Sequence, residues 1–228
     1  MDLLALTSMA VRPVLADLAP LLPPVRFEAA GGVEVARRIR AGATADLAVL
    51  AADALAALHA EGLAEAPRPL WDSETVAAVA AGAPPAALES ADDLRALLTS
   101  ARAVAHSTGP SGTALRALLD RLGLADRVHL VQAPPGTPAG TLLADGRADL
   151  AFQQHSELAG LPGVRILGPL PGDTAITSTF AAAVLTTAPR PERARALLDL
   201  LASGTADATA LARGMRPAGR PHPDAARR

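Results

Sequence analysis

The sequence predicts an α/β fold in which helices pack on a largely parallel sheet, organised as two lobes. Segments with the apolar pattern of strands alternate with segments of helical periodicity up to about residue 62, and the alternation resumes between about Val79 and Pro171. Half of the residues are hydrophobic but only 2% are aromatic, so Ala, Leu and Val must fill the core. Small aliphatic cores of this kind suit helices packed on a sheet.

The first lobe opens with three strand–helix pairs. Short apolar runs predict strands at residues 2–7, 25–29 and 46–50. Apolar residues spaced three and four apart predict helices at residues 11–22, 33–41 and 52–61. Pro23 and Pro24 end the first of these helices, and Gly62 is a C-terminal cap for the third. This order is typical of a parallel sheet with right-handed crossovers.

The second lobe repeats the pattern after an irregular stretch at residues 68–72 and a strand-like run at 74–81. Ser90 and Asp93 have the spacing of a capping box and predict a helix that ends at Thr99. Further apolar patterns predict strands at 103–105, 127–131, 148–152 and 164–167 and helices at 111–122 and 137–144.

The remaining chain predicts a long strand at 175–187 and helices at 189–202 and 205–213. The chain thus leaves the first lobe near residue 75 and returns near residue 178. We expect lobe 1 to comprise residues 1–75 and 178–215, and lobe 2 residues 76–177, with a two-strand hinge and a ligand cleft between them. Residues 216–228 lack apolar periodicity and are expected to form a disordered tail.

Composition excludes several classes of function. There is no cysteine, which excludes disulfides, thiolate metal sites and cysteine nucleophiles. The net charge is -2, so we expect no nucleic-acid partner. The histidines show no metal-ligand spacing, and the chain lacks the lysine that a phosphate-binding P-loop requires. We therefore expect neither a metal nor a cofactor.

One strand end carries polar side chains. Residues 148–154, ADLAFQQ, form an apolar run that ends in two amides, Gln153 and Gln154. Open α/β sheets bind ligands at the carboxyl ends of their strands. Side chains alternate in direction along a strand, and we expect Gln154 rather than Gln153 to face the ligand.

The ordered set of ALTSMAVRPVLADLAP, HSTGPSGTALRALLDRLGLADRV, GRADLAFQQHSELAG and FAAAVLTTAPRPERARALLDLL, followed by GMRPAG, resembles type II solute-binding proteins of the molybdate-binding-protein-like family. The resemblance covers about residues 3–217 and implies a two-lobed periplasmic-binding-protein-like fold. It implies capture of a small anion, a molybdate-like oxyanion or a small organic acid, by hydroxyls and by backbone N–H groups at helix N-termini. The partner it implies is an ABC-type permease.

We expect the ligand-binding residues at the strand-to-helix turns, and the resemblance points to Ser8, Gly31, Gly32, Gly136 and Gln154 among them. The expected ligand-binding residues are Ser8, Met9, Gly31, Gly32, Ser107, Thr108, Gly136, Thr137 and Gln154. Gly31 and Gly32 stand where the family has a serine-rich turn, and Gln154 stands where oxyanion binders have a tyrosine. The chain contains no tyrosine. At about 1.5–3 kcal/mol for each lost hydrogen bond to a charged ligand, two missing donors weaken oxyanion binding. A glutamine also offers an acceptor, which a carboxylic or hydroxy acid can use.

An enzyme on the same scaffold is the alternative. Some relatives of the family resemble aconitate isomerase, which moves a proton next to a carboxylate and so needs a positioned base. His106, which ends a strand beside HSTGPSG, and His155, which follows the two amides, are the candidates. We otherwise expect a non-enzymatic monomer.

No basic segment followed by an apolar segment opens the chain, so as given it is expected to be cytoplasmic. If a leader has been removed, the expected location is the periplasm or the exterior.

Overall fold

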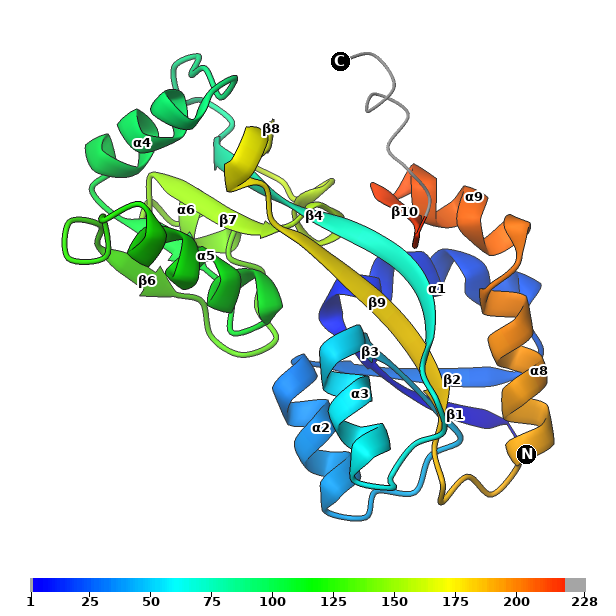
Figure 1. Cartoon of the computed structure of the whole chain (residues 1–228). Coiled ribbons are helices and arrows are strands. Elements are labelled where there is room, and N and C mark those ends of the chain that lie inside the picture. Colours follow the sequence, from blue (N-terminus) through cyan, green and yellow to red (C-terminus); the bar gives the residue numbers. More distant parts are fainter. Residues whose placement is uncertain (1, 220–228) are drawn as a thin grey trace. The chain divides into compact units, whose positions relative to one another are not determined.

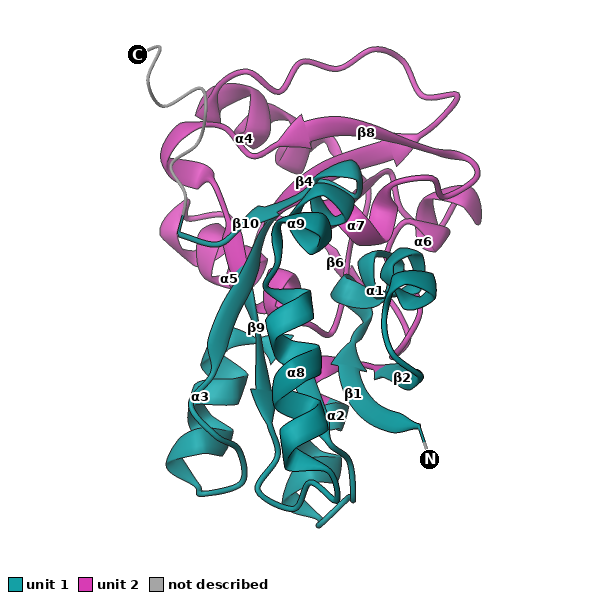
Figure 2. Cartoon of the chain, turned by 90° about the vertical axis from the view of Figure 1, so that its right-hand side faces the viewer, with its two compact units in different colours: residues 1–29, 34–73, 179–228 teal, residues 30–33, 74–178 magenta. Residues whose placement is uncertain are grey.

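The computed structural model describes residues 2–219, which form two compact units. Within the described residues, unit 1 comprises 2–29, Glu34–Ser73 and 179–219, and unit 2 comprises Ala30–Val33 and Glu74–Ser178 (Figure 2). The chain changes units within two residues of each expected lobe boundary. Residues 30–33, expected in the first lobe, instead cluster with unit 2.

Unit 1 is a sheet with helices on both faces. The strand order is β2-β1-β3-β9, in which β1 and β3 are parallel and β9 is antiparallel to β3. Figure 1 shows α2 and α3 on one side of these strands and α8 on the other. The elements are β1 (Leu3–Ser8), η1 (Met9–Val11), α1 (Arg12–Leu18), η2 (Ala19–Leu21), β2 (Val25–Ala30), α2 (Gly32–Arg40), β3 (Leu47–Ala51), α3 (Ala52–Ala60), β9 (Thr177–Val184), α8 (Pro191–Leu201), α9 (Gly204–Ala212) and β10 (Met215–Pro217).

In unit 2 the strand order is β4-β7-β5-β6, with β8 also paired to β4; the first part of β4, up to Ser73, belongs to unit 1. One apolar cluster, which includes Phe152 and Leu115, contains residues of α4 and α5, and another, which includes Ala151 and Leu142, contains residues of α6 and α7. The elements are β4 (Arg68–Ala80), α4 (Ala91–Ser100), β5 (Val104–His106), α5 (Pro110–Arg121), β6 (Leu130–Gln132), α6 (Thr141–Ala144), β7 (Leu150–Gln154), α7 (His155–Leu158), β8 (Val164–Pro169) and η3 (Gly172–Thr174).

Two expectations about irregular segments were wrong. Residues 68–72 are not a break but the first part of β4. Pro69, which has no backbone N–H to donate, is tolerated because it lies near the start of the strand. Arg216 and Pro217 are not tail: they form β10 and pair with Asp72 and Trp71. In both cases a partner distant in sequence provides the pairing. The rest of the predicted tail, from Arg220, lies outside the described residues.

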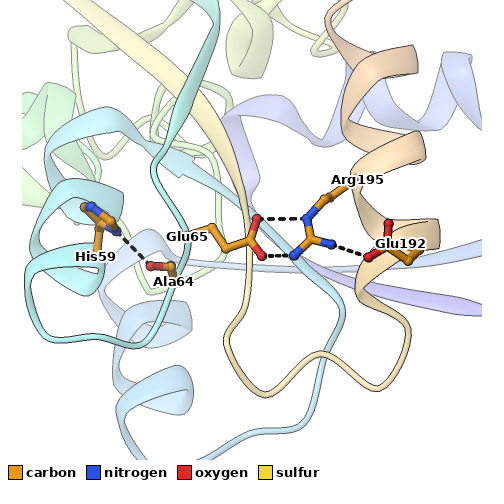
Figure 3. A network of polar contacts seen from close by, with 5 residues as sticks. All are labelled: His59, Ala64, Glu65, Glu192 and Arg195. Carbon is orange, nitrogen blue, oxygen red and sulfur yellow. Dashed lines mark hydrogen bonds and ion pairs between the residues drawn. The ribbon is translucent and has the colours of Figure 1, made fainter.

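Ion pairs fasten the helices of unit 1 to neighbouring segments. Arg195 on α8 binds Glu65 and, at 2.6 Å, Glu192, while His59 Nδ1 lies 2.9 Å from the carbonyl oxygen of Ala64 (Figure 3). These contacts hold the loop after α3 against α8. Among residues 2–219, no helix combines the length and the apolar character needed to cross a bilayer.

Candidate functional site

The parallel strands of unit 2 bring their carboxyl ends to one edge of the sheet. β5 pairs in parallel with both β6 and β7, and the register places His106 opposite Gln132 and Phe152. β7 then ends at Gln154, two residues beyond Phe152. The loop after His106 and the side chain of Gln154 therefore belong to the edge at which open α/β sheets bind ligands.

Two serine hydroxyls converge at the start of α5. Ser107 Oγ lies 3.2 Å from Ser111 Oγ and accepts a hydrogen bond from the Gly109 N–H at 3.2 Å. Ser111 is buried, and the first helical turn, Pro110–Ser111–Gly112, is uncharged. Pro110 has no N–H, and the Gly112 N–H donates to the Gly109 carbonyl at 3.0 Å, so the two hydroxyls and the partial positive charge of the helix start are what favour an anion here.

Glycines let the chain approach this loop closely. A Cβ atom at Gly112 would lie 2.0 Å from the carbonyl oxygen of Ser107 and 2.9 Å from His106 Nδ1, so only glycine fits. Gly31 belongs to the segment that clusters with unit 2, and a Cβ atom there would lie 3.8 Å from Thr108 Oγ1. The structure thus brings Gly31, Thr108 and the two serines together. Gly32 begins α2, whose first turn carries the acidic Glu34, which disfavours an anion there.

His106 is a positioning residue rather than a free base. Its Nδ1 lies 2.8 Å from the carbonyl oxygen of Ser107, and its Nε2 lies 3.1 Å from Arg116 Nη2. Arginine can only donate, so Nε2 carries the lone pair and Nδ1 the proton, an assignment made from the hydrogen-bond network. Burial lowers the pKa of His106, and the Arg116 charge lowers it further, against the opposing effect of the Ser107 carbonyl. Both ring nitrogens are engaged within unit 2.

The predicted helix start at Gly136 and Thr137 was wrong. Residues 134–137 form a turn in which the Thr137 N–H donates to the Pro134 carbonyl at 3.0 Å and Gly136 has φ +77°; the helix α6 begins only at Thr141. Pro-Pro-Gly followed by Thr has the chemistry of a type II turn, which favours proline at the second position and glycine at the third. The Thr137 N–H is consumed by this turn and no helix N-terminus lies here.

The two adjacent amides have different environments. Gln153 is buried, and both ends of its amide are hydrogen-bonded. Its Oε1 accepts from the Ala139 N–H at 2.6 Å, and its Nε2 donates to Glu157 Oε1 at 2.7 Å. Gln154 donates from Nε2 to Ser178 Oγ at 2.9 Å, but its buried Oε1 has no hydrogen-bond partner in the described part of the chain. Gln153 therefore holds the loop before α6, and Gln154 keeps an acceptor available.

Ser8 and Met9 lie in unit 1 at the end of β1. Ser8 is 5% exposed, and its Oγ has no partner among residues 2–219; the same is true of the neighbouring Thr7 Oγ1. Ser8 precedes η1 without making a side-chain cap, so helix capping does not account for it. Met9 begins η1 and is half-buried.

His155 is the first residue of α7, directly after Gln154. Its Nδ1 is buried and lacks a hydrogen-bond partner within the described residues. Of the two candidate bases, His155 alone keeps a ring nitrogen available by these contacts.

Two polar residues of this region escaped the sequence reasoning. Thr75 pairs with Gln154 in the β4–β7 ladder, and Ser178 accepts the Gln154 amide. The signal for Thr75 was a hydroxyl in the otherwise apolar run TVAAVA, but only the strand register reveals its neighbour.

Comparison with known proteins identifies the family. Residues 23–216 match the model of the family described as "Bacterial extracellular solute-binding protein", and the chain belongs to this family. A curated relative, aconitate isomerase from Pseudomonas sp., is 34% identical over 188 residues, which cover 80% of this chain and 71% of the relative.

Solved structures show the same fold at low sequence identity. The periplasmic molybdate-binding protein of Azotobacter vinelandii has a TM-score of 0.79 at 19% identity, covering 97% of this chain and all of that one. The sulfate-binding protein of Mycobacterium tuberculosis has a TM-score of 0.73 at 18% identity, covering 96% and 88%. The chain therefore has the periplasmic-binding-protein fold that the sequence predicts.

Proposed function

We propose that this solute-binding protein captures a small anion whose charged group sits at the N-terminus of α5. The observation that carries the proposal is the pair of hydroxyls, Ser107 and Ser111, 3.2 Å apart at an uncharged helix start. A neutral set of donors binds an anion without a paired cation because the helix terminus supplies the partial positive charge.

The surroundings of the loop support this role. The Ser107 carbonyl is bound by His106 Nδ1 and packs closely against Gly112, which holds the loop backbone in place. Thr108, near Gly31, adds a third hydroxyl. Solved structures with this fold are named for binding molybdate and sulfate, which are small anions. We further propose that the protein is a monomer and delivers its solute to an ABC-type permease.

Ligand binding by two serine variants tests the proposal. Purified protein is titrated by calorimetry with molybdate, tungstate, sulfate, phosphate, citrate and both aconitate isomers. For the best ligand, we expect Ser107→Ala and Ser111→Ala each to weaken binding about tenfold or more, since a hydrogen bond to a charged group contributes about 1.5–3 kcal/mol.

Ser100→Ala is the matched control, because Ser100 is an exposed serine on α4 of the same unit. It should bind like the wild type. Wild-type affinity in both Ser107→Ala and Ser111→Ala, or no binding of any anion in the panel, would contradict the proposal.

Isomerisation of aconitate is the second candidate function. The identity to aconitate isomerase and the available Nδ1 of His155 favour it. A base beside a bound carboxylate is what proton transfer at the neighbouring carbon requires. Incubation with either aconitate isomer, followed by chromatography, would reveal turnover.

In that case His155→Gln should reduce kcat by about a hundredfold or more. His129→Gln, at an exposed histidine of unit 2, should leave it unchanged. Binding of aconitate without conversion would eliminate the enzyme and leave the solute-binding role.

A further inference from the structure

Three residues of unit 2, on the strands β4, β7 and β9, bring polar side chains into one small group, which we call the amide cluster: Thr75, Gln154 and Ser178. Thr75 on β4 stands directly opposite Gln154 on β7 in the antiparallel ladder. Residues paired in this way project from the same face of the sheet. Ser178 on β9 accepts the Gln154 amide at 2.9 Å.

Two buried atoms of the amide cluster lack partners among residues 2–219. They are Gln154 Oε1 and Thr75 Oγ1, in side chains that are 1% and 0% exposed. Buried polar groups are nearly always hydrogen-bonded, because leaving one unpaired is unfavourable. The neighbouring Gln153 shows the contrast, since both ends of its amide are bound within unit 2.

The chemistry of these two atoms is specific. One Nε2 hydrogen of Gln154 is bound to Ser178, so the atom of this amide that lacks any partner among the described residues is the acceptor Oε1, and the threonine hydroxyl can donate or accept. A group that matches this pair must itself bring a proton. A ligand hydroxyl does so, because it can donate to Oε1 and accept from Oγ1, whereas an oxygen of a fully ionised oxyanion presents only lone pairs to Oε1.

We propose that the amide cluster is a subsite for the hydroxyl group of a small hydroxycarboxylic acid. The inference rests on the proposed function, in which a charged group of the same ligand binds at the N-terminus of α5. β5 and β7 are neighbouring parallel strands, so the loop that follows β5 and the end of β7 share one sheet edge. One end of the ligand is recognised by charge and the other by hydrogen bonding.

Pairs of acids that differ only by one hydroxyl test the subsite. Malate is compared with succinate, and citrate with tricarballylate, with molybdate as the proton-free oxyanion. For at least one pair we expect the wild type to bind the hydroxylated acid about tenfold more tightly, as one hydrogen bond warrants, and more tightly than molybdate.

Two variants assign that preference to the amide cluster. Gln154→Met and Thr75→Val each remove the polar atoms at nearly constant volume, and should reduce the preference to less than about threefold while affinity for the deoxy acid changes little. Thr99→Val, at an exposed threonine of α4, is the matched control and should keep the full preference. Thermal unfolding without ligand verifies folding, and if Gln154→Met fails to fold, Thr75→Val decides.

The outcomes separate this inference from the proposed function. If anions bind and depend on Ser107 and Ser111, but no pair is discriminated or molybdate binds best, the hydroxyl subsite is wrong and anion capture stands. If neither variant alters a tenfold preference, the hydroxyl is recognised elsewhere and the subsite is likewise wrong. If nothing binds, both proposals fall.

Discussion

The protonation state of a single histidine, His106, affects the conformation of the loop at the proposed anion site. His106 donates to the Ser107 carbonyl and accepts from Arg116, an arrangement that needs the neutral ring. Protonation would place a second N–H against the guanidinium. The loop geometry is therefore coupled to a group whose pKa lies below its ordinary value.

This coupling predicts a pH dependence of stability. The pKa of His106 is lower in the folded than in the unfolded chain, so its contribution is complete above the unfolded value, about 6.5, and is lost as the pH falls from there toward the folded pKa. Urea unfolding at pH 7.5 and at pH 5.5 should show a smaller loss of stability in His106→Gln than in the wild type. His129→Gln should lose as much as the wild type, and equal losses in all three proteins would contradict this explanation.

Gly112 has no room for a side chain. Because the atom that a Cβ would meet is the backbone oxygen of Ser107, at 2.0 Å, the loop itself must move in Gly112→Ala. We expect a loss of about 3 kcal/mol in the free energy of unfolding, at the upper end for an added methyl group, together with loss of anion binding. Denaturant titration and calorimetry measure both.

Gly82→Ala is the comparison, since a methyl group at that exposed position would meet no atom of the described chain within 4 Å. Normal stability and binding in Gly112→Ala would mean that the close approach of the loop is unimportant.

Individual site residues were partly predictable. Ser107 directly follows β5 and Gln154 is the last residue of β7, and these positions indicate a ligand edge, whereas Ser111 lies in the first turn of α5 and was not in the predicted set. Thr75 and Ser178 were not predictable, because Thr75 reaches Gln154 through a strand register and Ser178 reaches it through a side-chain hydrogen bond between residues distant in sequence. The prediction that a helix begins at Thr137 was wrong because a local turn uses its N–H, and its role as a ligand-binding residue stays a prediction.

At the scale of elements, one buried carboxylate joins three segments of unit 1. Asp46, just before β3, accepts from the Leu4 N–H of β1 at 2.8 Å and binds the Arg190 side chain, just before α8, at 3.0 Å. It also accepts from the Arg190 N–H at 3.1 Å. Asp46 is completely buried, and these partners bind both of its carboxylate oxygens.

Asp46→Asn should therefore be strongly destabilising. Removing one partner of a buried ion pair typically costs about 3–5 kcal/mol, because the other charge is left uncompensated. Asp199→Asn, which breaks the exposed pair with Arg68, should cost less than about 1 kcal/mol. Urea midpoints of the two variants compare them directly, and similar losses would argue against a joining role for Asp46.

Most elements could be predicted because their signals are local. Helices with an amphipathic stripe, such as α5, and strands flanked by turn residues, such as β3, lie close to the predicted limits. The failures have two causes. β10 and the first part of β4 depend on pairing with distant segments, and α6 begins late because a proline–glycine turn precedes it. The local periodicity of apolar residues indicates neither strand pairing with a distant segment nor a turn that delays the start of a helix.

For the molecule as a whole, exposed carboxylates set the response to acid. Hydrogen bonds to arginine lower the pKa of Asp17, Glu28, Glu34, Glu61 and Asp149. Groups with a lowered folded pKa stabilise the fold above their unfolded pKa, and this contribution disappears as the pH falls through the folded pKa. These pairs are spread over both units.

We therefore expect the melting temperature to fall steeply below about pH 4.5, where the carboxylates of the unfolded chain begin to take up protons while those of the folded chain stay ionised. The fall should become shallower in 1 M sodium chloride. Salt already weakens the exposed ion pairs at pH 7, so protonation of their carboxylates removes less stabilisation. Calorimetric scans from pH 7 to pH 3 at low and high salt measure it, and salt-independent curves would contradict this account.

The division of the chain into units has a consequence for synthesis on the ribosome. The sheet of unit 1 is interrupted in sequence, because β3 ends at Ala51 and its neighbour β9 begins at Thr177. Nearly all of unit 2 is encoded between them. The nascent polypeptide must therefore expose β3 until unit 2 has emerged, and we expect unit 2 to fold first although it is encoded second. Until β9 has been synthesised, β3 lacks this neighbour, and every residue of β3 is buried in the folded unit. It is therefore the segment that a chaperone would need to shield.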